Sequence, residues 1–278
     1  MPGSDESALQ RAERVYSAAA DHFTRPALAF WDVYGAETVR RAGIGAGDRV
    51  LDLCCGAGAS VLPAARAVGA DGSVTGVDIT APLLDQARAR AESAGLTNVE
   101  LIRADATATG LDDASFDAVL CVFGVFFVDD MPGFVREMWR MVRPGGRLAV
   151  TTWGPGVWDP ASSVFWEAVR HVRPDLHRSF NPWDEITTPD ALVDLLAAGG
   201  VVQPTAEAIT GSQVLESSAD FWDVVLGSGY RGTVDALDED GRGALKAAVI
   251  DGVRRDGISE IRTDVVIGVA TKPSSGAT

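Results

Sequence analysis

Short apolar runs of strand length alternate with longer segments of helical spacing through the first half of the chain. The strand-like runs lie at residues 50–54, 74–77, 99–102, 118–123 and 148–152, and helices are predicted between them at about 57–68, 81–94 and 131–141. Buried strands that alternate with helices form parallel sheets with right-handed crossovers. The pattern therefore predicts an α/β fold with a doubly wound, mostly parallel sheet.

The two ends of the chain extend this pattern. A predicted helix at about residues 6–20 and an aromatic-rich segment precede the first strand. After Trp153 a stretch rich in proline and glycine, with a helix near 162–171, is interpreted as an insertion over the sheet. A helix at 189–198 and strands near 206–210 and 264–270 bring the sheet to seven strands. We predict three parts: an N-terminal helical segment (1–46), a core (47–153), and a lid insertion followed by completion of the sheet (154–278).

Glycines follow the first strand directly, and an acidic residue ends the second. Gly56 and Gly58 let the chain turn sharply and bring its backbone close to a ligand, and the helix after them would offer free N–H groups to an anionic group. Asp78 can accept hydrogen bonds from ribose hydroxyls. Because the carboxyl ends of parallel strands meet at one edge, a nucleoside cofactor is predicted to bind there.

The same loop disfavours a nicotinamide cofactor. The dinucleotide fingerprint needs a third glycine to clear a pyrophosphate, and this chain has Ser60 and Val61 there. Asp52 precedes the loop, where it would repel a pyrophosphate. A nicotinamide-dependent oxidoreductase is therefore a minor alternative.

The ordered set of motifs resembles class I S-adenosylmethionine-dependent methyltransferases. The matching segments are 52–58, Asp78, 104–106, 116–119 and 143–146. The chain is most similar to the small-molecule branch that includes ubiquinone and menaquinone C-methyltransferases, because Phe123-Gly124 followed by 128–130 resembles that group. This resemblance implies S-adenosyl-L-methionine as cofactor, a Rossmann-like sheet, and an N-terminal segment, 1–46, that covers the cofactor site.

The resemblance also implies which residues hold the methionine end of the cofactor. Asp52 would anchor it directly or through water, and the backbone of Cys54, Gly56 and Gly58 would wrap the amino-acid moiety. The end of the fourth strand, from Cys121 to Phe123, would present carbonyls to the ammonium group. The family usually has glycine where this chain has Cys54, so the thiol either narrows the pocket or points into the sheet. A redox role for the Cys54-Cys55 pair is an alternative.

The nucleoside end is assigned in the same way. Asp78 matches the ribose-binding acid and Ile79 would pack on the adenine. Asp105 would accept a hydrogen bond from the adenine amino group, beside the N–H of Ala106. A turn aspartate is the alternative for Asp105, since Asp is common in loops.

Methyl transfer needs few catalytic side chains, because the methyl group on the sulfonium is already activated. Alignment of the acceptor atom with the methyl–sulfur bond supplies much of the acceleration. Any general base would come from the histidines His22, His171 and His177, each of which has an ordinary surface or structural role as its alternative. Aromatic residues near the predicted crevice favour a small, largely apolar or aromatic acceptor. A protein of this fold that binds the cofactor without transferring methyl (a cyclase, sensor or scaffold) is the alternative function.

Composition restricts the partners. A formal charge of −15 disfavours nucleic acid. No run reaches the roughly 18 apolar residues of a membrane helix, and the polar first ten residues lack a secretory signal. The cysteines Cys54, Cys55 and Cys121 fit no zinc pattern, so no metal is expected. A reducing, cytoplasmic location is expected instead of an oxidising one. The N-terminal segment could close its own site or that of a second copy, which would make the protein a homodimer.

Overall fold

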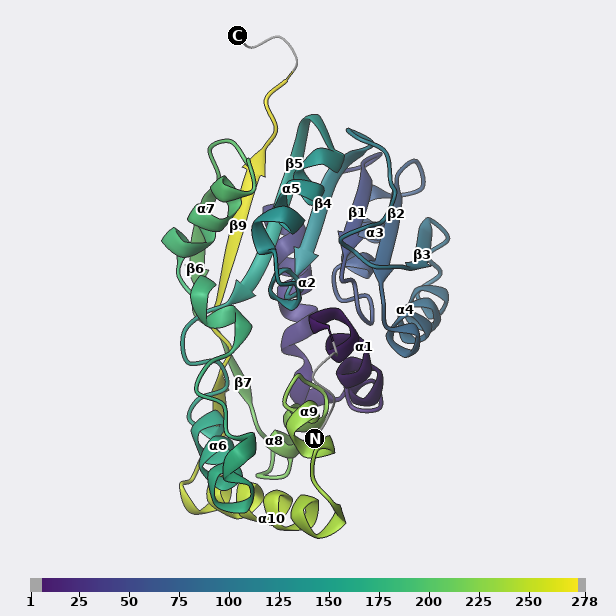
Figure 1. Ribbon diagram of the computed structural model, residues 1–278. Helices are drawn as coiled ribbons and strands as arrows, with labels where there is room; N and C mark the ends of the chain where they lie inside the picture. Colours follow the sequence, from purple (N-terminus) through teal and green to yellow (C-terminus); the bar gives the residue numbers. More distant parts are fainter. Residues whose placement is uncertain (1–6, 275–278) are drawn as a thin grey trace.

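The computed structural model describes residues 7–274 and centres on one seven-stranded sheet (Figure 1). The strands are β1 (Arg49–Leu53), β2 (Ser73–Asp78), β3 (Val99–Arg103), β4 (Phe116–Val122), β5 (Val142–Trp153), β6 (Thr205–Ile209) and β9 (Val265–Thr271). Their order is β3-β2-β1-β4-β5-β9-β6. Only β9 runs antiparallel to its neighbours, β5 and β6. The predicted doubly wound, mostly parallel sheet is confirmed.

Helices cover both faces of the sheet because its strands are apolar on both faces. On one face lie α2 (Phe30–Arg41), α3 (Val61–Val68) and α4 (Ala81–Ser93), and on the other lie α5 (Met131–Met141) and α7 (Pro189–Ala198). Successive strand residues point to opposite faces, so Val50 packs with α3 while Leu51 packs with α5. Both residues are fully buried. This two-sided burial produces the near-continuous apolar runs in the sequence.

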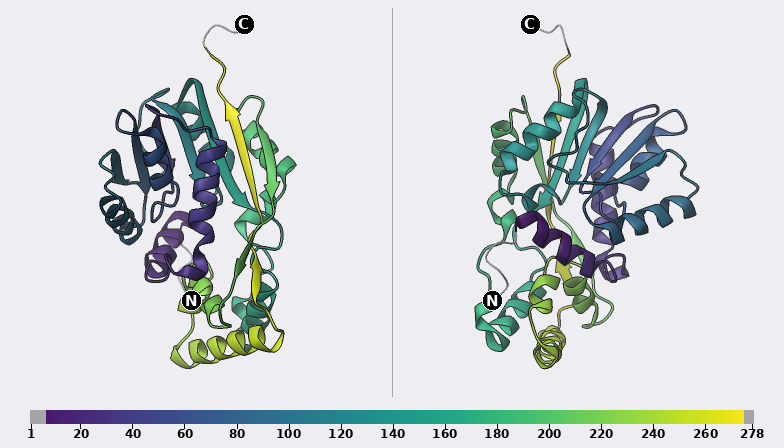
Figure 2. Two further views of the ribbon diagram at one scale, coloured as in Figure 1. Left: turned by 180° about the vertical axis from the view of Figure 1, so that it is seen from behind. Right: turned by 45° about the vertical axis from the view of Figure 1, so that its right-hand side comes forward.

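A second lobe lies beyond the carboxyl ends of the parallel strands (Figures 1 and 2). We call it the helical lobe; it contains α6 (Ala161–Val172), α8 (Asp220–Leu226), α9 (Arg231–Asp235), α10 (Glu239–Arg255) and the two-stranded sheet of β7 (Ser212–Val214) and β8 (Glu260–Arg262). The short helices η3 (Pro174–Leu176) and η4 (Pro182–Ile186) connect α6 to α7. The lobe places side chains opposite the edge of the sheet where the sequence motifs converge.

Helix α1 (Ala8–Ala19) lies between the sheet and the helical lobe (Figure 2, right). Its N-terminus carries a capping box, in which Ser7 Oγ accepts from the N–H of Gln10 and the Gln10 side chain accepts from the N–H of Ser7. The helix contacts α4, α9 and η2 (Val125–Phe127). It is followed by η1 (Pro26–Leu28).

Two details differ from the sequence-based expectation. Helix α3 begins at Val61 and not at 57, because Gly56 and Gly58 have φ values of +51° and +86°, which a right-handed helix excludes. The short strands β7 and β8 were not predicted; each has three residues, too few to show a period. Within residues 7–274, no helix is long and apolar enough to cross a membrane.

Candidate cofactor and acceptor site

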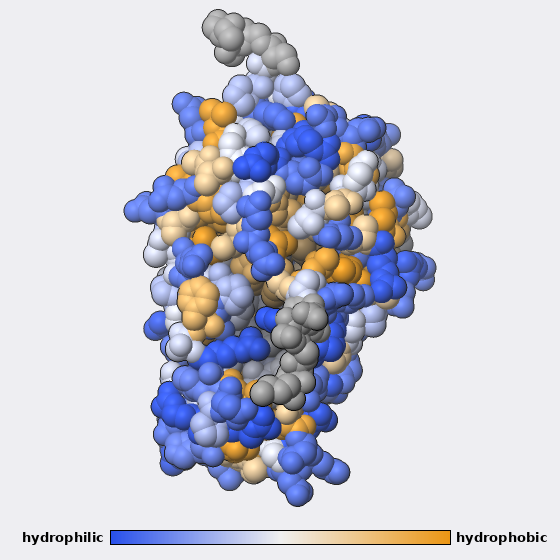
Figure 3. Space-filling view, viewed as in Figure 1, coloured by the Kyte–Doolittle hydropathy of each residue, from blue (hydrophilic) through white to orange (hydrophobic). Residues whose placement is uncertain are grey.

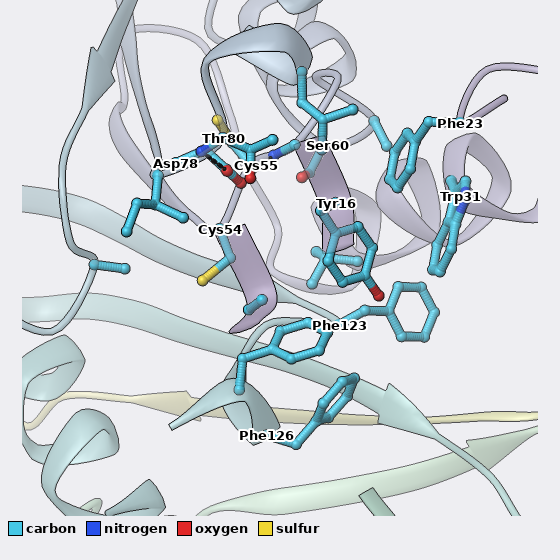
Figure 4. A pocket seen from close by; sticks show the side chains of 18 of the residues that line it. Tyr16, Phe23, Trp31, Cys54, Cys55, Ser60, Asp78, Thr80, Phe123 and Phe126 are labelled. Carbon is cyan, nitrogen blue, oxygen red and sulfur yellow. Dashed lines mark hydrogen bonds between the residues drawn. The ribbon is translucent and has the colours of Figure 1, made fainter. Parts of the chain in front are cut away.

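Asp78, at the end of β2, is hydrogen-bonded to the loop from β1 to α3 (Figure 4). The N–H of Gly56 donates to Asp78 Oδ2 at 2.8 Å, and the N–H of Thr80 donates to Asp78 Oδ1 at 2.8 Å. The side chain is 8% exposed. Burial raises the pKa of Asp78, and these backbone hydrogen bonds oppose the increase. Asp78 therefore shapes the glycine loop and lies on the wall of the pocket at the same time.

Asp52 lies in the interior behind this loop. Ser60 Oγ donates to Asp52 Oδ2 at 2.5 Å, while Asp52 Oδ1 is buried without a partner among the described residues. Burial raises the pKa of Asp52 to about 7, and the charge of Asp78 acts in the same direction. A buried carboxylate oxygen with no donor is costly, and a cationic donor such as the ammonium of an amino acid would satisfy it. Ser60, and not Asp52, faces the pocket.

The pocket lies at the carboxyl edge of β1, β2 and β4, beneath α1. It brings together six of the sequence-predicted cofactor residues, namely Cys54, Gly56, Asp78, Ile79, Ala106 and Phe123. Four others do not line it: Asp52, Gly58, Asp105 and Cys121. The cradle at Gly56 is open, since a Cβ there would meet nothing closer than the Phe23 ring at 3.7 Å.

The residues outside the pocket wall have local structural partners. Asp105 Oδ1 accepts from the N–H of Thr107 at 2.8 Å and from its hydroxyl at 2.7 Å, the geometry of a turn aspartate. It lies on a neighbouring pocket beside the start of α1. A Cβ on Gly58 would come within 2.6 Å of Leu62 Cδ1, so this glycine is required by packing as well as by its backbone conformation.

Cys54 and Cys55 form part of the floor of the pocket, and Cys121 contacts Cys54. Cys54 has φ +59° and packs against Gly124, where a Cβ would approach Cys54 Sγ to 2.7 Å and Cys121 Sγ to 2.9 Å. A hydrogen bond with Cys121, together with burial, raises the pKa of Cys54 well above its usual range. Burial does the same to the pKa of Cys55. Reactive cysteines have lowered pKa values, so these environments give no support to the redox alternative.

Aromatic side chains form the opposite wall. Phe123 stacks on Trp153 with centroids 4.1 Å apart, and Trp31 stacks on Phe23 at 5.3 Å. Trp31 also contacts Phe123 edge to face at 5.2 Å. Aromatic faces attract cations, so this wall suits a sulfonium as well as a flat apolar molecule. The buried Nε1 of Trp31 has no acceptor within residues 7–274.

None of the three histidines lies on this wall. His22 Nδ1 is 2.7 Å from Asp21 Oδ1, outside the pocket. His171 Nδ1 is 2.8 Å from the carbonyl oxygen of Glu167 in its own helix, and His177 Nε2 is 2.9 Å from Arg170 Nη2 in a separate polar pocket. The structure thus separates all three candidate bases from the cofactor residues. Within the described chain, no group of three His, Cys, Asp or Glu side chains could hold a metal ion.

Tyr16 is the main wall residue that was not assigned to the site from the sequence. It comes from α1 and contacts Phe127 at 5.2 Å between ring centroids. Burial, and then the charge of Asp78, raise the pKa of its hydroxyl. Ala12 and Leu9, one and two turns earlier on the same face of α1, also line the pocket. Their spacing was the available signal, although it does not say what the helix faces.

Residues 50–146 match the family described as methyltransferase domain. An aklanonic acid methyltransferase of Streptomyces sp. (strain C5) is 32% identical over 148 residues, which cover 53% of this chain and 67% of that protein. A demethylmenaquinone methyltransferase of Listeria welshimeri is 36% identical over 147 residues. That alignment covers 52% of this chain and 61% of the relative, so the chain spans about three fifths of its length.

Solved structures agree at the level of the fold. A phosphoethanolamine N-methyltransferase 2 of Haemonchus contortus, in complex with S-adenosyl-L-methionine, superposes with a TM-score of 0.60 at 17% identity. The match covers 99% of this chain and 62% of that one. The buried Asp52 oxygen and the open cradle at Gly56 fit that cofactor. The chain belongs to the class I S-adenosylmethionine-dependent methyltransferases.

Proposed function

We propose that the protein transfers the methyl group to a small, largely apolar or aromatic molecule. The observation that carries this proposal is the pocket wall, where Phe123, Trp153 and Trp31 continue without interruption from the edge at which Asp78 lies. Apolar and aromatic walls with few polar groups are typical of sites for such ligands. The comparisons lend no support to the alternative of a protein that binds the cofactor without methyl transfer.

Three residues, Asp78, Ala106 and Asp52, are proposed to hold the cofactor. Asp78 would accept from the ribose hydroxyls with lone pairs not used by Gly56 and Thr80, and Ala106 would face the adenine. Asp52 would attract the ammonium group, through Ser60 or a water, because its Oδ1 is without a donor. When bound, S-adenosylmethionine supplies a methyl group already activated on a sulfonium.

The remaining task of the chain is to align the acceptor and exclude water. Tyr16 and Phe127 close the pocket from the side of α1 and η2. The titratable side chains on the wall are Tyr16, Cys54, Cys55 and Asp78, and the pKa of each is raised. We propose that the acceptor brings an atom acidic enough to react without a histidine base.

Three further proposals concern the whole chain. Residues 1–46 would cover the cofactor, 47–153 bind it, and 154–278 form the lid insertion and complete the sheet. A cytoplasmic location is supported by the free state of Cys54, Cys55 and Cys121. The charge of −15 supports the absence of a nucleic-acid partner. Assembly as a homodimer stays a prediction.

Thermal unfolding tests the cofactor assignment first. S-Adenosylmethionine and S-adenosylhomocysteine, at about 100 times their dissociation constants, should each add roughly 2.7 kcal/mol of stability, whereas NADH should add none. Asp78→Ala should lose most of that stabilisation, because both the ribose contact and the loop geometry depend on the carboxylate. Asp112→Ala, an exposed loop aspartate, is the matched control. Stabilisation by NADH, or full stabilisation of Asp78→Ala, would contradict the assignment.

A screen for the acceptor would then use methyl-labelled S-adenosylmethionine with polycyclic phenols on one side and sugars on the other. Transfer to phenols alone is expected. Transfer to sugars alone would contradict the proposed acceptor class while leaving the cofactor assignment intact.

A further inference from the structure

We propose that Cys54 determines the size of the alkyl group on the sulfonium of the cofactor. Its side chain fills the floor beneath that group and leaves room for a methyl but not for an ethyl. Cys54 is then a specificity-determining residue for the donor. The inference rests on the proposed function, because it concerns the binding site of that same cofactor.

The place of the sulfonium follows from the two ends of the cofactor. In the proposed binding mode the ammonium group lies near Ser60 and the ribose lies at Asp78. The sulfur is bonded between these two ends, so it lies across the start of the loop from β1 to α3, where Cys54 lines the pocket. In Figure 4, Cys54 lies between Asp78 and Phe123.

The alkyl group has to point toward the acceptor, because transfer requires the acceptor atom, the carbon and the sulfur to lie nearly in line. The proposed acceptor lies on the aromatic wall, and Phe123 and Val122 bring this wall to the loop. Figure 3 shows apolar residues recessed between the sheet and the helical lobe, with hydrophilic residues around them. The alkyl group therefore lies at an apolar junction of loop and wall, where fit decides which group binds.

The side chain of Cys54 occupies the space in which residue 124 would otherwise place its own. A Cβ on Gly124 would be 2.4 Å from Cys54 Cβ, 2.7 Å from Cys54 Sγ and 2.9 Å from Cys121 Sγ. Non-bonded atoms do not approach so closely, so Cys54 requires a glycine at position 124. Cys121 is fully buried and pairs with Leu53 in the register of β4 and β1. The floor below Cys54 is closed, and its side chain cannot withdraw to admit a larger group.

The backbone at Cys54 favours a different residue. Its φ is +59°, in the left-handed region that glycine adopts freely and that costs other residues free energy. Glycine would fit this turn better and would leave the pocket larger. The chain instead carries a thiol that is only half-buried, whereas Cys55 and Cys121 are buried. A strained residue on the wall of a pocket points to a function of its side chain.

One methylene is enough for selection between donors. In an apolar pocket, an extra or missing methylene changes binding by roughly 10- to 200-fold. An ethyl group exceeds a methyl group by one methylene, and one sulfur atom occupies a comparable volume. Loss of the Cys54 side chain should therefore let the ethyl group fit.

Calorimetry with S-adenosyl-L-methionine and S-adenosyl-L-ethionine tests this inference, and S-adenosylhomocysteine, which has no alkyl group, is the reference. The wild-type protein should bind the ethyl compound at least about tenfold more weakly than the methyl compound. Cys54→Gly should reduce this ratio to roughly threefold or less, with little change in the affinity for S-adenosylhomocysteine. The variant should fold, because the backbone at this position suits glycine. Cys54→Ala, which keeps the Cβ, should give an intermediate ratio.

An exchange of atoms between positions 54 and 124 separates size from other effects. Gly124→Ala alone should weaken binding of both compounds, because the new Cβ would push Cys54 into the pocket. In the double variant Cys54→Gly/Gly124→Ala that Cβ enters the vacated space, so the ratio should rise above that of Cys54→Gly. Alanine can adopt the backbone of Gly124, whose φ is −110°.

Val249→Ala in α10 is the control, because it removes atoms from a fully buried side chain remote from the pocket. It should keep the wild-type ratio. Equal binding of the two compounds by the wild-type protein, or a methyl preference that survives Cys54→Gly unchanged, would overturn the inference. Failure of the wild-type protein to bind S-adenosylhomocysteine would contradict the proposed function instead, so the two failures are distinguishable.

Discussion

Two buried carboxylates, Asp52 and Asp78, lie at the same edge of the sheet in different environments. Asp78 accepts two backbone N–H groups and is largely satisfied without a ligand. Asp52 is fully buried, has one hydroxyl donor and retains an oxygen with no partner. At the scale of single residues, therefore, Asp78 shapes the loop, while Asp52 has a carboxylate oxygen without a donor, which we propose the ammonium end of the cofactor satisfies through Ser60 or a water.

The pH dependence of stability should report the titration of Asp52. The pKa of Asp52 is raised from 3.8 to about 7 in the folded chain. Between those values the folded state binds a proton that the unfolded state has lost. The contribution of the Asp52 carboxyl to the free energy of unfolding is therefore fully present below about pH 4. It decreases as pH rises toward 7, with a slope of about 1.4 kcal/mol per pH unit. Because other carboxyls such as Asp78 also have shifted pKa values, the contribution of Asp52 is the difference in slope between the wild-type protein and Asp52→Asn, measured by urea unfolding of the cofactor-free proteins at several pH values.

The same substitution should act oppositely on cofactor binding. A bound ammonium favours the ionised carboxylate, so affinity for S-adenosylhomocysteine should rise between pH 5 and 7 in the wild-type protein. Asp52→Asn should bind more weakly and with little dependence on pH in that range. Identical pH profiles for the two proteins, in stability and in binding, would mean that Asp52 does not titrate there.

At the scale of elements, helix α2 holds the turn that precedes α3. Gly35 of α2 lies so close to this turn that a Cβ on it would be 2.3 Å from the carbonyl oxygen of Ala59. Thr38 fixes the helix on the other side, because its hydroxyl is 2.6 Å from Thr151 Oγ1 on β5. Ala59 and Ser60 line the cofactor pocket. The position of α2 therefore sets the position of the pocket wall.

Gly35→Ala should displace this turn. The contact is with backbone and cannot be relieved by rotating a side chain, so we expect a loss of stability of about 1–3 kcal/mol together with weaker cofactor binding. Gly243→Ala in α10 is the control, since a Cβ there meets nothing within 4 Å and alanine favours a helix. It should stabilise the protein by up to about 1 kcal/mol. Urea unfolding measures the stability of the two variants, and calorimetry measures their cofactor binding. If Gly35→Ala changed neither quantity, α2 would not constrain the turn.

Elements with a complete local signal were predictable from the sequence. Helix α5 follows Asp130, whose side chain accepts from the N–H of Gly133, and α7 follows Thr188, which accepts from the N–H of Ala191. The sequence predicts only an aromatic-rich segment where helix α2 lies, because the buried residues of this helix contact both the sheet and the aromatic wall. Such two-sided contact removes the simple helical periodicity of apolar positions.

The candidate site was predictable where one residue type determines the geometry. Gly56 and Asp78 are of this kind, because the turn and the strand end leave few alternatives. The wall contributed by Tyr16 depends on how α1 packs against distant segments, for which a single sequence carries no pattern. Asp105 shows the opposite case: its side chain is engaged by Thr107, so a local turn explains its position.

At the scale of the whole molecule, helix α1 lies between the edge of the sheet, where it lines the cofactor pocket, and the helical lobe (Figure 2). Helix α1 contacts α4 on the side of the sheet and α9 on the side of the lobe. Only Val15 and Ala19 of its twelve residues are buried. A helix held by so few buried residues is expected to open more readily than the core strands.

A ligand in the pocket should therefore stabilise α1 more visibly than any other helix. Where opening requires loss of the ligand, S-adenosylhomocysteine at 100 times its dissociation constant should slow amide hydrogen exchange about 100-fold. We expect that protection over residues 8–19 and in the loop from β1 to α3, and no change in α10, which is remote from the pocket and serves as the internal control. Exchange measured by mass spectrometry with and without the ligand tests this. Protection limited to the loop would mean that the N-terminal helix does not close over the cofactor, and that the aromatic wall alone excludes water from the reacting atoms.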